Sequence, residues 1–584
     1  MLKVLTLITL ASTSVVVTGL VPAATSACKC IPSDTCWPTA TKWDILNKTV
    51  SGRLLQTTPV AAPCYAGPNY DAAECAAVVA NWTESPFQAD YPIGYIYPQT
   101  QSCDIPGGNT TTCSLGTSPV YAINATTTSD IIAGIEFARL NNIRLVVKTT
   151  GHDILARSTG FGSLEIWLRY FRHGVTFQQA YQPTDGSCEC IWDGPVISVQ
   201  GGYSWQDVYP IAIDNNVIVV GGGCPDVSVL GGYTQGGGHS LANHEFGLAA
   251  DQLLEAQVIL ASGEIVTASG CENTDLFTAI RGGGGGTYGI VISGIIKAHP
   301  ESTITAQVFA MAPLSSDDAG LSGYGSWMAY APYQIVEPYH SGLNWAFAAF
   351  GQTPAQVEAS FAPTLKRLST YNGTSLYIST SYLTFGSYYA YYYALNGVNS
   401  AAQSKAALVS RLMGRDDLSS VANVSQMLNI TAGTPDQFTL TEICLIGGGA
   451  VLEDSRFSGV NPAWRKAYII NLVALGWQDT ADYTTIEAAQ YDITYVKGAA
   501  MTALSPDMGA YMNEGNYKDP DYLFNFYGAA HPKHEAAKAK YDPKSLFYCP
   551  TCVGSDKPVS VVAVPSAPEQ YNTSGLELPL SKAE

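Results

Sequence analysis

Hydrophobic and polar residues follow one another in the first half of the chain in patterns that predict short helices and strands. Over residues 130–139 apolar side chains recur at helical spacing, and Ser129 stands where a helix N-cap is expected. Residues 143–148 form an apolar run typical of a strand. Four further strands, separated by glycine clusters, are predicted at residues 197–200, 217–220, 256–260 and 290–297. This half is therefore expected to be an α+β domain with glycine-rich loops.

The pattern changes after about residue 301, where tyrosine, alanine, serine and phenylalanine become frequent. Helical spacing over residues 354–368 and 401–413 predicts two helices. The tyrosine-rich stretch 388–393 is more typical of core or sheet packing than of a binding platform. A final amphipathic helix is predicted over residues 532–540. The second half is thus expected to begin a separate domain.

The N-terminus has the organisation of a secretory signal. Lys3 supplies a positive charge, residues 4–20 are an apolar run, and small residues at positions 25–27 precede Cys28. A membrane anchor is the alternative, although the run contains Thr and Ser and is short for a span of ~20 residues. We expect cleavage after residue 27 and a secreted, extracellular protein that has no membrane attachment afterwards.

The 14 cysteines agree with an oxidising compartment, because many of them cluster near the two ends of the chain. Disulfides are favoured over a zinc site at Cys549 and Cys552, since no second pair has matching spacing. The pairing stays open. Residues 28–116 are read as an irregular, Cys-rich extension and residues 561–584 as a tail. Eight glycosylation sequons predict surface positions in a secreted glycoprotein: Asn47, Asn81, Asn109, Asn124, Asn372, Asn423, Asn429 and Asn572.

The charge balance argues against nucleic acid as a partner. The 584 residues carry 48 acidic and 29 basic side chains, a formal net charge of −19, so the chain offers no basic surface for phosphates. With 13% charged and 46% hydrophobic residues, the composition is that of a globular protein. The length suits a large enzyme of two or three domains.

Three glycine clusters, at residues 221–223, 231–238 and 282–286, carry the first chemical signal. Glycine lets a backbone approach another molecule closely, and runs of exposed N–H groups bind anions such as pyrophosphate. A Rossmann turn is disfavoured, because Gly286 leads into a β-branched strand and not into a helix. Simple tight turns are the alternative explanation. They explain three clusters close together less well than they would explain a single cluster.

The segments around these glycines resemble one known family. Residues 148–160, with the step Gly151-His152-Asp153, and residues 164–167 are similar to the flavin-attachment loop of the vanillyl-alcohol-oxidase (PCMH-type) family, in its berberine-bridge-enzyme-like branch. The loop 221–232 resembles that of members whose Cys also bonds the flavin. The resemblance continues at residues 236–240, 247–252, 275–283, 511–514 and 540–548, and the segment 28–32 is similar to secreted fungal members.

This resemblance implies the architecture and the cofactor. The expected fold class is α+β: a two-subdomain PCMH-type FAD-binding domain over residues 117–300, an α+β substrate domain over 301–504, and a C-terminal berberine-bridge-like module over 505–560. FAD is expected between these domains, attached through His152 and also through Cys224. Ser228 stands where the branch usually has Gly, which weakens the cysteinyl assignment more than the histidyl one.

Further site residues follow from the same resemblance. A loop histidine and a disulfide cysteine are the structural alternatives for His152 and Cys224. If Cys224 holds flavin, 13 cysteines remain, so at least one is unpaired, with Cys271 and Cys444 as candidates. The implied cofactor-binding residues are Gly151, His152, Arg157, Ser158, Cys224, Val227, Gly231, Gly232, Gly236, Gly237, Gly238, Gly283 and Val291.

The implied activity is that of a secreted FAD-dependent oxidase that takes hydride from an alcohol or sugar hydroxyl and passes electrons to O2, giving H2O2. Tyr511 is expected to take the hydroxyl proton with Asn513 as its hydrogen-bonding partner, on a C-terminal strand whose opposite face carries Glu514, another possible base. Val227 corresponds to the residue that controls access of O2 in the resembling family, and its small side chain favours an oxidase.

Two other functions stay open, and no metal site is expected. The first is a dehydrogenase or oxidative cyclase of secondary metabolism, which would use the same cofactor. The second is a secreted binding protein that keeps the fold without turnover, and yellow protein that bleaches with substrate would exclude it. The specific substrate is an alcohol or carbohydrate that the sequence does not identify.

Overall fold

The computed structural model describes residues 28–557 with internal gaps at 96, 98–101, 106–111, 185, 187–191, 315–333, 337–342, 396–404, 433–437, 454 and 479–480. The expected signal (1–27) and tail (561–584) lie outside the described residues. Cys30–Lys557 is one compact unit, so the boundaries at 117, 301 and 505 stay predictions. No helix of the described residues is long and apolar enough to cross a bilayer.

The first sheet combines the N-terminal extension with the start of the predicted flavin domain. Its strand order is β1-β2-β4-β3. β1 belongs to the extension and pairs antiparallel with β2, whereas β2 and β3 both run parallel to β4. The extension also forms helices and is therefore more regular than expected. The bounds are α1 Ala40–Thr49, β1 Leu54–Gln56, α2 Ala72–Asn81, α3 Ser85–Ala89, β2 Tyr121–Asn124, α4 Thr128–Leu140, β3 Arg144–Lys148 and β4 Ser163–Trp167.

Helix α4 begins two residues earlier than the sequence suggested. Thr127, not Ser129, caps it in a capping box with Asp130. Arg53 of the extension binds the Asp130 carboxylate at 2.5 Å, and hydrogen bonds from Arg53, Thr126 and Thr127 lower the pKa of Asp130 against the opposing effect of burial. The extension is therefore fastened to the first helix of the flavin half.

The second sheet is antiparallel, with strand order β5-β6-β10-β8-β9. The predicted strand 290–297 is confirmed as β10, which has a bulge after Val291 where it pairs with β8. Three short helices, α6, α7 and α8, lie between β7 and β8. Helix α9 packs against the C-terminal helix α16. The bounds are β5 Arg172–Gln178, β6 Val196–Gly201, α5 Trp205–Asp214, β7 Val217–Ile218, α6 Gly232–Gln235, α7 Asn243–Phe246, α8 Ala249–Gln252, β8 Leu253–Ile259, β9 Ile265–Ser269, α9 Thr274–Ala279, β10 Ile290–Lys297 and β11 His299–Pro300.

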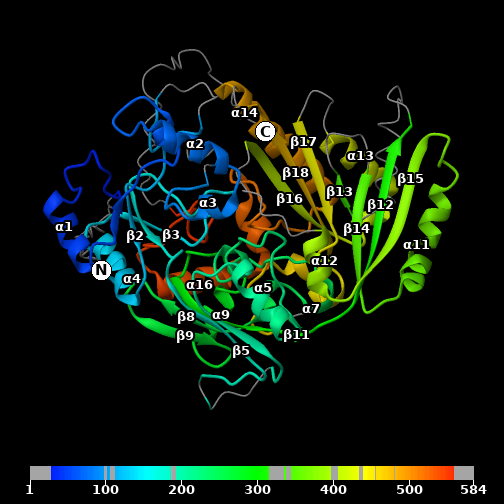
Figure 1. Cartoon of the computed structure of the whole chain (residues 1–584), viewed down its shortest axis with the longest axis horizontal. Coiled ribbons are helices and arrows are strands. Elements are labelled where there is room, and N and C mark those ends of the chain that lie inside the picture. The colour runs from blue at the N-terminus through cyan, green and yellow to red at the C-terminus, as the bar shows by residue number, and fades with distance from the viewer. Residues whose placement is uncertain are drawn as a thin grey trace, which may run out of the picture. The chain divides into compact units, whose positions relative to one another are not determined.

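The third sheet holds the second half of the chain and is antiparallel throughout, in the order β15-β12-β14-β13-β17-β18-β16. Figure 1 shows it in yellow-green and orange, with α11 beside β15. The predicted helix 354–368 is confirmed as α11, where Thr353 forms a capping box and Pro354 opens the helix. The bounds are β12 Ile304–Pro313, β13 Gln334–Val336, β14 Leu343–Phe350, α11 Pro354–Leu368, β15 Leu376–Phe385, α12 Tyr388–Leu395, β16 Ala406–Gly414, α13 Val421–Thr431, β17 Phe438–Cys444, β18 Ala467–Gly476, α14 Tyr483–Tyr491 and α15 Gly498–Leu504.

The helix predicted over residues 401–413 is wrong. The described part of that stretch is strand β16, most of whose residues are buried, because β18 pairs along it and α15 packs against it. A strand that is buried on both faces has no alternation, so its apolar run looks helical in sequence. The tyrosine-rich stretch is helix α12, whose four buried tyrosines confirm a packing role: Tyr388, Tyr389, Tyr391 and Tyr392.

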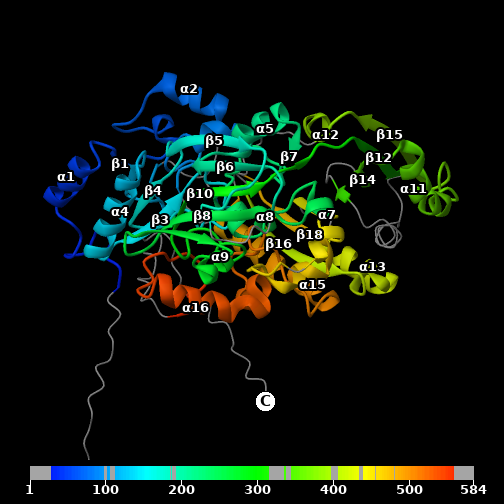
Figure 2. The same cartoon turned by 90° about the horizontal axis from the view of Figure 1, so that it is seen from below.

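The last helix, α16 (His531–Tyr541), confirms the predicted one and lies below β8 and α9 in Figure 2. Cys549 and Cys552 follow it and form a disulfide, so the zinc alternative is wrong. Three more disulfides tie the extension: Cys30–Cys36, Cys64–Cys75 and Cys103–Cys113.

The described sequons fall into two groups. Asn81, Asn372, Asn423 and Asn429 are exposed. Asn47 and Asn124 are half-buried, and the Oδ1 atom of Asn124, in β2, is buried without a hydrogen-bond partner, which disfavours a glycan there. Asn109 and Asn572 lie outside the described residues.

Candidate flavin site

A cavity of about 300 Å³ lies where the loop after β3, two glycine clusters and the C-terminal segment meet. This volume is at the lower end of the range of small-molecule sites. Besides apolar side chains it is lined by ten of the residues that the sequence predicted: Gly151, His152, Arg157, Ser158, Val227, Gly231, Gly232, Val291, Tyr511 and Asn513. The structure therefore brings together both catalytic and most cofactor-binding candidates.

Two glycines on facing walls approach each other closely. A Cβ atom on Gly285 would lie 3.2 Å from the Cα and N atoms of Gly232. Any side chain at Gly285 would press on the Gly232 backbone, so glycine lets the two loops pack this closely at the cavity wall. Glycine-rich loops can turn backbone N–H groups toward a phosphate-bearing chain, and the residues present thus fit an FAD molecule.

The other predicted glycines support the cavity from behind. A Cβ atom on Gly236 would lie 2.6 Å from the Nδ2 atom of Asn513, and one on Gly283 would lie 2.4 Å from the hydroxyl of Tyr288. Gly237 and Gly238 have φ values of +119° and +72°, a conformation that other residues rarely adopt. These four glycines do not line the cavity.

The imidazole of His152 is held on one side by three groups. Its Nε2 atom lies 2.8 Å from the Ser85 hydroxyl, 2.7 Å from the Tyr95 hydroxyl and 3.3 Å from the Oδ2 atom of Asp226. No hydrogen bond joins Nδ1 to any residue in the described part of the chain. Since His152 also lines the cavity, Nδ1 is the ring nitrogen left for a bond to a ligand.

Asp226 is fully buried and anchors this group. Its Oδ1 atom accepts a hydrogen bond from Gln206 at 3.0 Å and lies 3.7 Å from Arg169. Burial would raise the pKa of Asp226, but the contact with His152, the Ser85 hydrogen bond and the charge of Arg169 lower it. Asp226 is therefore a carboxylate, and an acceptor next to Nε2 stabilises the tautomer with its proton on Nε2.

Sequence analysis missed Ser85, Tyr95 and Asp226. Asp226 stands two positions after Cys224, in a loop that had been matched to the family, so its place in the motif was a usable signal. Ser85 and Tyr95 belong to the extension, where no motif pointed to them.

Cys224 lies at the end of a loop that follows β7, outside the residues that line the cavity. Its thiol is half-buried and outside any disulfide, and burial raises its pKa to about 11. Helix α12 holds this loop, because Tyr392 donates to the carbonyl of Gly223 at 2.7 Å, and α5 adds a bond of 2.7 Å from Tyr209 to Gly222.

The two cysteines proposed as unpaired behave differently. Cys271 is disulfide-bonded, so that half of the expectation is wrong. Cys444 is a thiol that donates to Glu442 at 2.9 Å.

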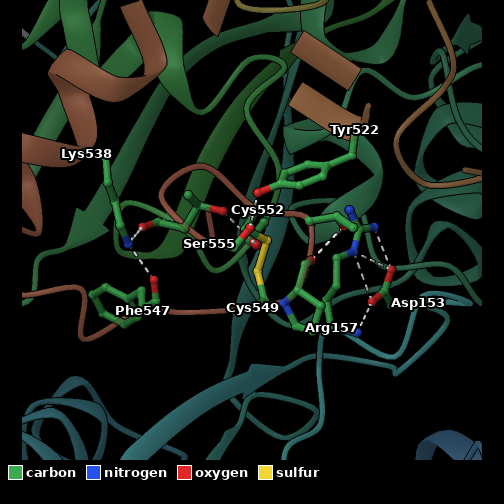
Figure 3. Close-up of a disulfide and its surroundings, with 12 residues drawn as sticks. Asp153, Arg157, Tyr522, Lys538, Phe547, Cys549, Cys552 and Ser555 are labelled. Atoms are coloured by element: carbon green, nitrogen blue, oxygen red, sulfur yellow. Dashed lines mark hydrogen bonds and ion pairs between the residues drawn. A yellow bond between two sulfur atoms is a disulfide. The ribbon is translucent and has the colours of Figure 1, made fainter. Parts of the chain in front are cut away.

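The C-terminal segment reaches the cavity through Asn513. Its Nδ2 atom donates to the Tyr511 hydroxyl at 2.7 Å and to the Gly232 carbonyl at 2.9 Å, and its Oδ1 atom accepts from Arg157 at 2.9 Å. Arg157 is in turn paired with Asp153 at 2.6 Å. Figure 3 shows Arg157 and Asp153 beside the Cys549–Cys552 disulfide, whose Cys549 lines the same cavity.

The residues 511–514 form a turn and not the expected strand. Strand alternation therefore does not apply, and Glu514 lines the same cavity as Tyr511 and Asn513. The Oε1 atom of Glu514 lies 2.8 Å from the Nε2 atom of His239. Burial opposes protonation of His239, but the charge and hydrogen bond of Glu514 raise its pKa, so Glu514 stabilises the protonated imidazole.

The surroundings of Tyr511 do not favour its phenolate. Burial and the neighbouring charge of Glu514 raise the pKa of Tyr511 far above its ordinary value, and the Asn513 hydrogen bond and Arg157 counter this only in part. Tyr511 is therefore a neutral phenol at physiological pH. No cluster of three or more His, Cys, Asp or Glu side chains suited to a metal occurs among the described residues.

Comparisons with known proteins identify the family of this chain. Residues 119–269 match the FAD binding domain family. The FAD-linked oxidoreductase hmp9 of Hypomyces subiculosus is 40% identical over 557 residues, which cover 91% of this chain and 88% of the relative. The crystal structure of the VAO-type flavoprotein MtVAO713 from Myceliophthora thermophila C1 matches with a TM-score of 0.86 at 39% identity, over 90% of this chain and 97% of that chain.

More distant proteins widen the picture. The bifunctional decalin synthase calF of Penicillium decumbens is 30% identical over 556 residues, 92% of this chain and 95% of the relative. Glucooligosaccharide oxidase from Acremonium strictum, described with a 6-S-cysteinyl, 8α-N1-histidyl FAD, shares the fold with a TM-score of 0.60 at 19% identity, over 75% of this chain and 92% of that chain. The BBE-like 1 protein of Physcomitrella patens does so with a TM-score of 0.59 at 18% identity, over 74% and 91%.

The identity to hmp9 extends over nine-tenths of this chain, and glycine-rich loops line the cavity. The chain belongs to the VAO-type FAD-linked oxidoreductases, whose α+β fold it shares with berberine-bridge-enzyme-like proteins.

Proposed function

We propose that the protein is a secreted oxidase that transfers hydride from an alcohol or sugar hydroxyl to covalently bound FAD and then reduces O2 to H2O2. The observation that carries this proposal is the meeting of His152, Tyr511 and Glu514 at one cavity. These side chains supply an attachment point for the cofactor and groups that handle the proton of a hydroxyl.

His152 and Cys224 are proposed to hold the flavin, and the glycines at 231, 232 and 285 are proposed to lie against it. Bound FAD would supply the redox chemistry, accepting a hydride and returning two electrons to O2. The glucooligosaccharide oxidase that shares the fold is described with bonds of both kinds, which supports both links. A covalent bond also prevents loss of FAD outside the cell, where free cofactor is scarce.

Tyr511, Asn513 and Glu514 are proposed to bind the reacting hydroxyl. Asn513 donates to the Tyr511 oxygen, so the Tyr511 hydroxyl hydrogen is left to hold a substrate oxygen. Because Tyr511 is a neutral phenol, the carboxylate of Glu514, which lies 2.8 Å from His239, is the better acceptor for the substrate proton.

Secretion is proposed from the described disulfides, which persist in oxidising compartments. The exposed sequons at Asn81, Asn372, Asn423 and Asn429 are the proposed glycan sites.

A second candidate function is a dehydrogenase or oxidative cyclase of secondary metabolism. Its support is the relative calF, which is a decalin synthase by name. The two candidates share the cofactor and differ in the electron acceptor and in the product.

The test begins with the absorbance of purified protein before and after acid precipitation. We expect a yellow precipitate, and we expect Cys224→Ala/His152→Ala protein to release all of its flavin where Cys224→Ala alone does not. An alcohol and carbohydrate screen coupled to peroxide detection then separates the functions. Colourless protein would support a non-catalytic binding protein, and reoxidation by artificial acceptors alone would support the dehydrogenase.

A further inference from the structure

The N-terminal extension reaches the flavin site and contacts the residue proposed to carry the cofactor. We propose that Ser85 and Tyr95 of this extension are positioning residues for covalent attachment, which hold His152 with Nδ1 available for the bond. This inference rests on the proposed His152 linkage. It adds that the flavin domain alone lacks two of the side chains that position His152 for attachment.

The hydrogen bonds around Nε2 of His152 determine its tautomer. The Ser85 and Tyr95 hydroxyls each carry one hydrogen, and both lie within reach of the same Asp226 oxygen, at 2.8 Å and 3.0 Å. The two hydroxyls also contact each other, so one of them donates to the other. The second then donates to Asp226, because a carboxylate can only accept. Both hydroxyl hydrogens are used in this arrangement, so Nε2 carries the hydrogen of its own contact and Nδ1 keeps the lone pair.

Hydrogen bonds from Lys148 hold the extension in this position. The ammonium group of Lys148, at the end of β3, donates to three backbone carbonyls of the extension, those of Tyr91 at 3.0 Å, Pro92 at 2.8 Å and Gly94 at 3.3 Å. Lys148 is almost fully buried. Strand β3, which leads into the His152 loop, therefore holds the turn before Tyr95 through these three hydrogen bonds.

The backbone at this contact has a positive φ on both sides, which is costly for Tyr95 but not for Gly151. Tyr95 has a φ value of +59° and Gly151 one of +100°. A bulky residue at positive φ is a rare conformation that persists where the surroundings impose it, often at functional sites. A Cβ atom on Gly151 would lie 3.0 Å from the Tyr95 ring, so glycine there allows the extension to come this close.

The attachment itself balances with the oxidant that the proposed function uses. A bond forms between Nδ1 and the 8α carbon of the flavin, and one C–H bond of that methyl group breaks. Its proton would pass to solvent, its electron pair would reduce O2, and two protons from solvent would complete H2O2. Nδ1 becomes fully substituted, and the Nε2–H bond to the Ser85, Tyr95 and Asp226 group stabilises the charge that develops on the ring.

The test measures the ratio of acid-stable to total bound flavin in the purified full-length protein. A Cys224→Ala background restricts the measurement to the His152 bond. In that background Tyr95→Phe and Ser85→Ala are each expected to lower the ratio by about tenfold, by analogy with the effect of groups that orient a ligating histidine. Total bound flavin, read from absorbance before precipitation, is expected to change much less, whereas a merely structural defect would reduce binding itself.

Tyr65→Phe is the matched control. Tyr65 also belongs to the extension, and its buried hydroxyl donates to the carbonyl of Asp104 at 2.7 Å, away from His152. We expect an unchanged ratio for this variant. Unchanged ratios for both Tyr95→Phe and Ser85→Ala would overturn the inference. Acid-stable flavin in Cys224→Ala/His152→Ala protein would instead overturn the linkage on which it rests.

Discussion

At the residue scale, the environments of Glu514 and Tyr511 favour Glu514 as the proposed acceptor of the substrate proton. Glu514 is paired with His239 and lines the cavity, whereas the raised pKa of Tyr511 keeps that phenol neutral. We predict that Glu514→Gln slows anaerobic flavin reduction by substrate by about 10²–10⁴-fold, the usual contribution of a general base. Tyr511→Phe is predicted to cost much less, since it removes one hydrogen bond to the substrate. Stopped-flow absorbance of the flavin measures both.

The comparison includes its own control. If Tyr511→Phe proves the more damaging substitution, Tyr511 is the acceptor that the sequence first suggested.

Val227 concerns the second half of the reaction. Its backbone is fixed on both sides, since its N–H donates to Cys224 at 3.3 Å and its carbonyl accepts from Trp205 at 3.1 Å, and its side chain lines the cavity. A close-packed wall with a fixed backbone has little room for an added methylene. Val227→Leu is therefore predicted to slow reoxidation by O2 and to leave anaerobic reduction nearly unchanged. Equal reoxidation rates in stopped-flow traces would refute the assignment of Val227 to O2 access.

At the scale of elements, α12 of the second half holds a loop of the first. Tyr392 donates to the carbonyl of Gly223 beside Cys224, and a hydrogen bond of this kind contributes about 0.5–1.5 kcal/mol. Tyr392→Phe is therefore predicted to lower the share of flavin that joins two peptides in mass mapping. The control is Tyr393→Phe, since Tyr393 is 51% exposed. A loss of equal size in the control would contradict this role of α12.

Strands and helices were predictable where their patterns were clean. β10 and α11 occur where apolar spacing, caps and flanking glycines agreed. The prediction failed at β16, where burial on both faces removes the alternation, and at residues 511–514, where a family motif was assumed to be extended. Patterns within one element cannot report which neighbour will cover its second face, and that contact decided the structure of β16.

At the scale of the whole molecule, the buried Glu165 of β4 predicts a pH dependence of stability. Burial raises its pKa from an ordinary 4.5 to about 8, against the opposing charge of Lys148, and its oxygens have no hydrogen-bond partner. Between these pH values the folded chain keeps a proton that the unfolded chain releases. Stability attributable to Glu165 is therefore present below about pH 4.5 and is lost as the pH rises toward 8.

We predict that Glu165→Gln, which keeps the shape and removes the ionisable group, flattens that decline. Its Tm should differ little from the parent's at pH 5 and exceed it by a few degrees at pH 8. Thermal unfolding followed by circular dichroism at both pH values measures this. Parallel Tm profiles for the two proteins would refute the prediction.

The candidate site was predictable as far as its residues lie in the family motif. His152, the glycine walls and Tyr511 all meet at the cavity, but the partners that orient His152 come from a segment without a motif. Their contact with Asp226 spans 141 positions for Ser85. Contacts between segments so far apart depend on how whole domains pack, and local spacing carries no information about that.

Such distances also have a consequence for how the protein matures. The bond between Arg157 and Asn513 joins positions 356 apart, and contacts of high sequence separation form late, because a long loop must close before they gain any energy. The cavity is thus complete only when the ribosome has released almost the entire chain and its distant parts have met. Under the proposed linkage, a molecule that does not fold completely forms no covalent bond to flavin. The amount of flavin that stays on the denatured protein therefore measures how many molecules had folded completely.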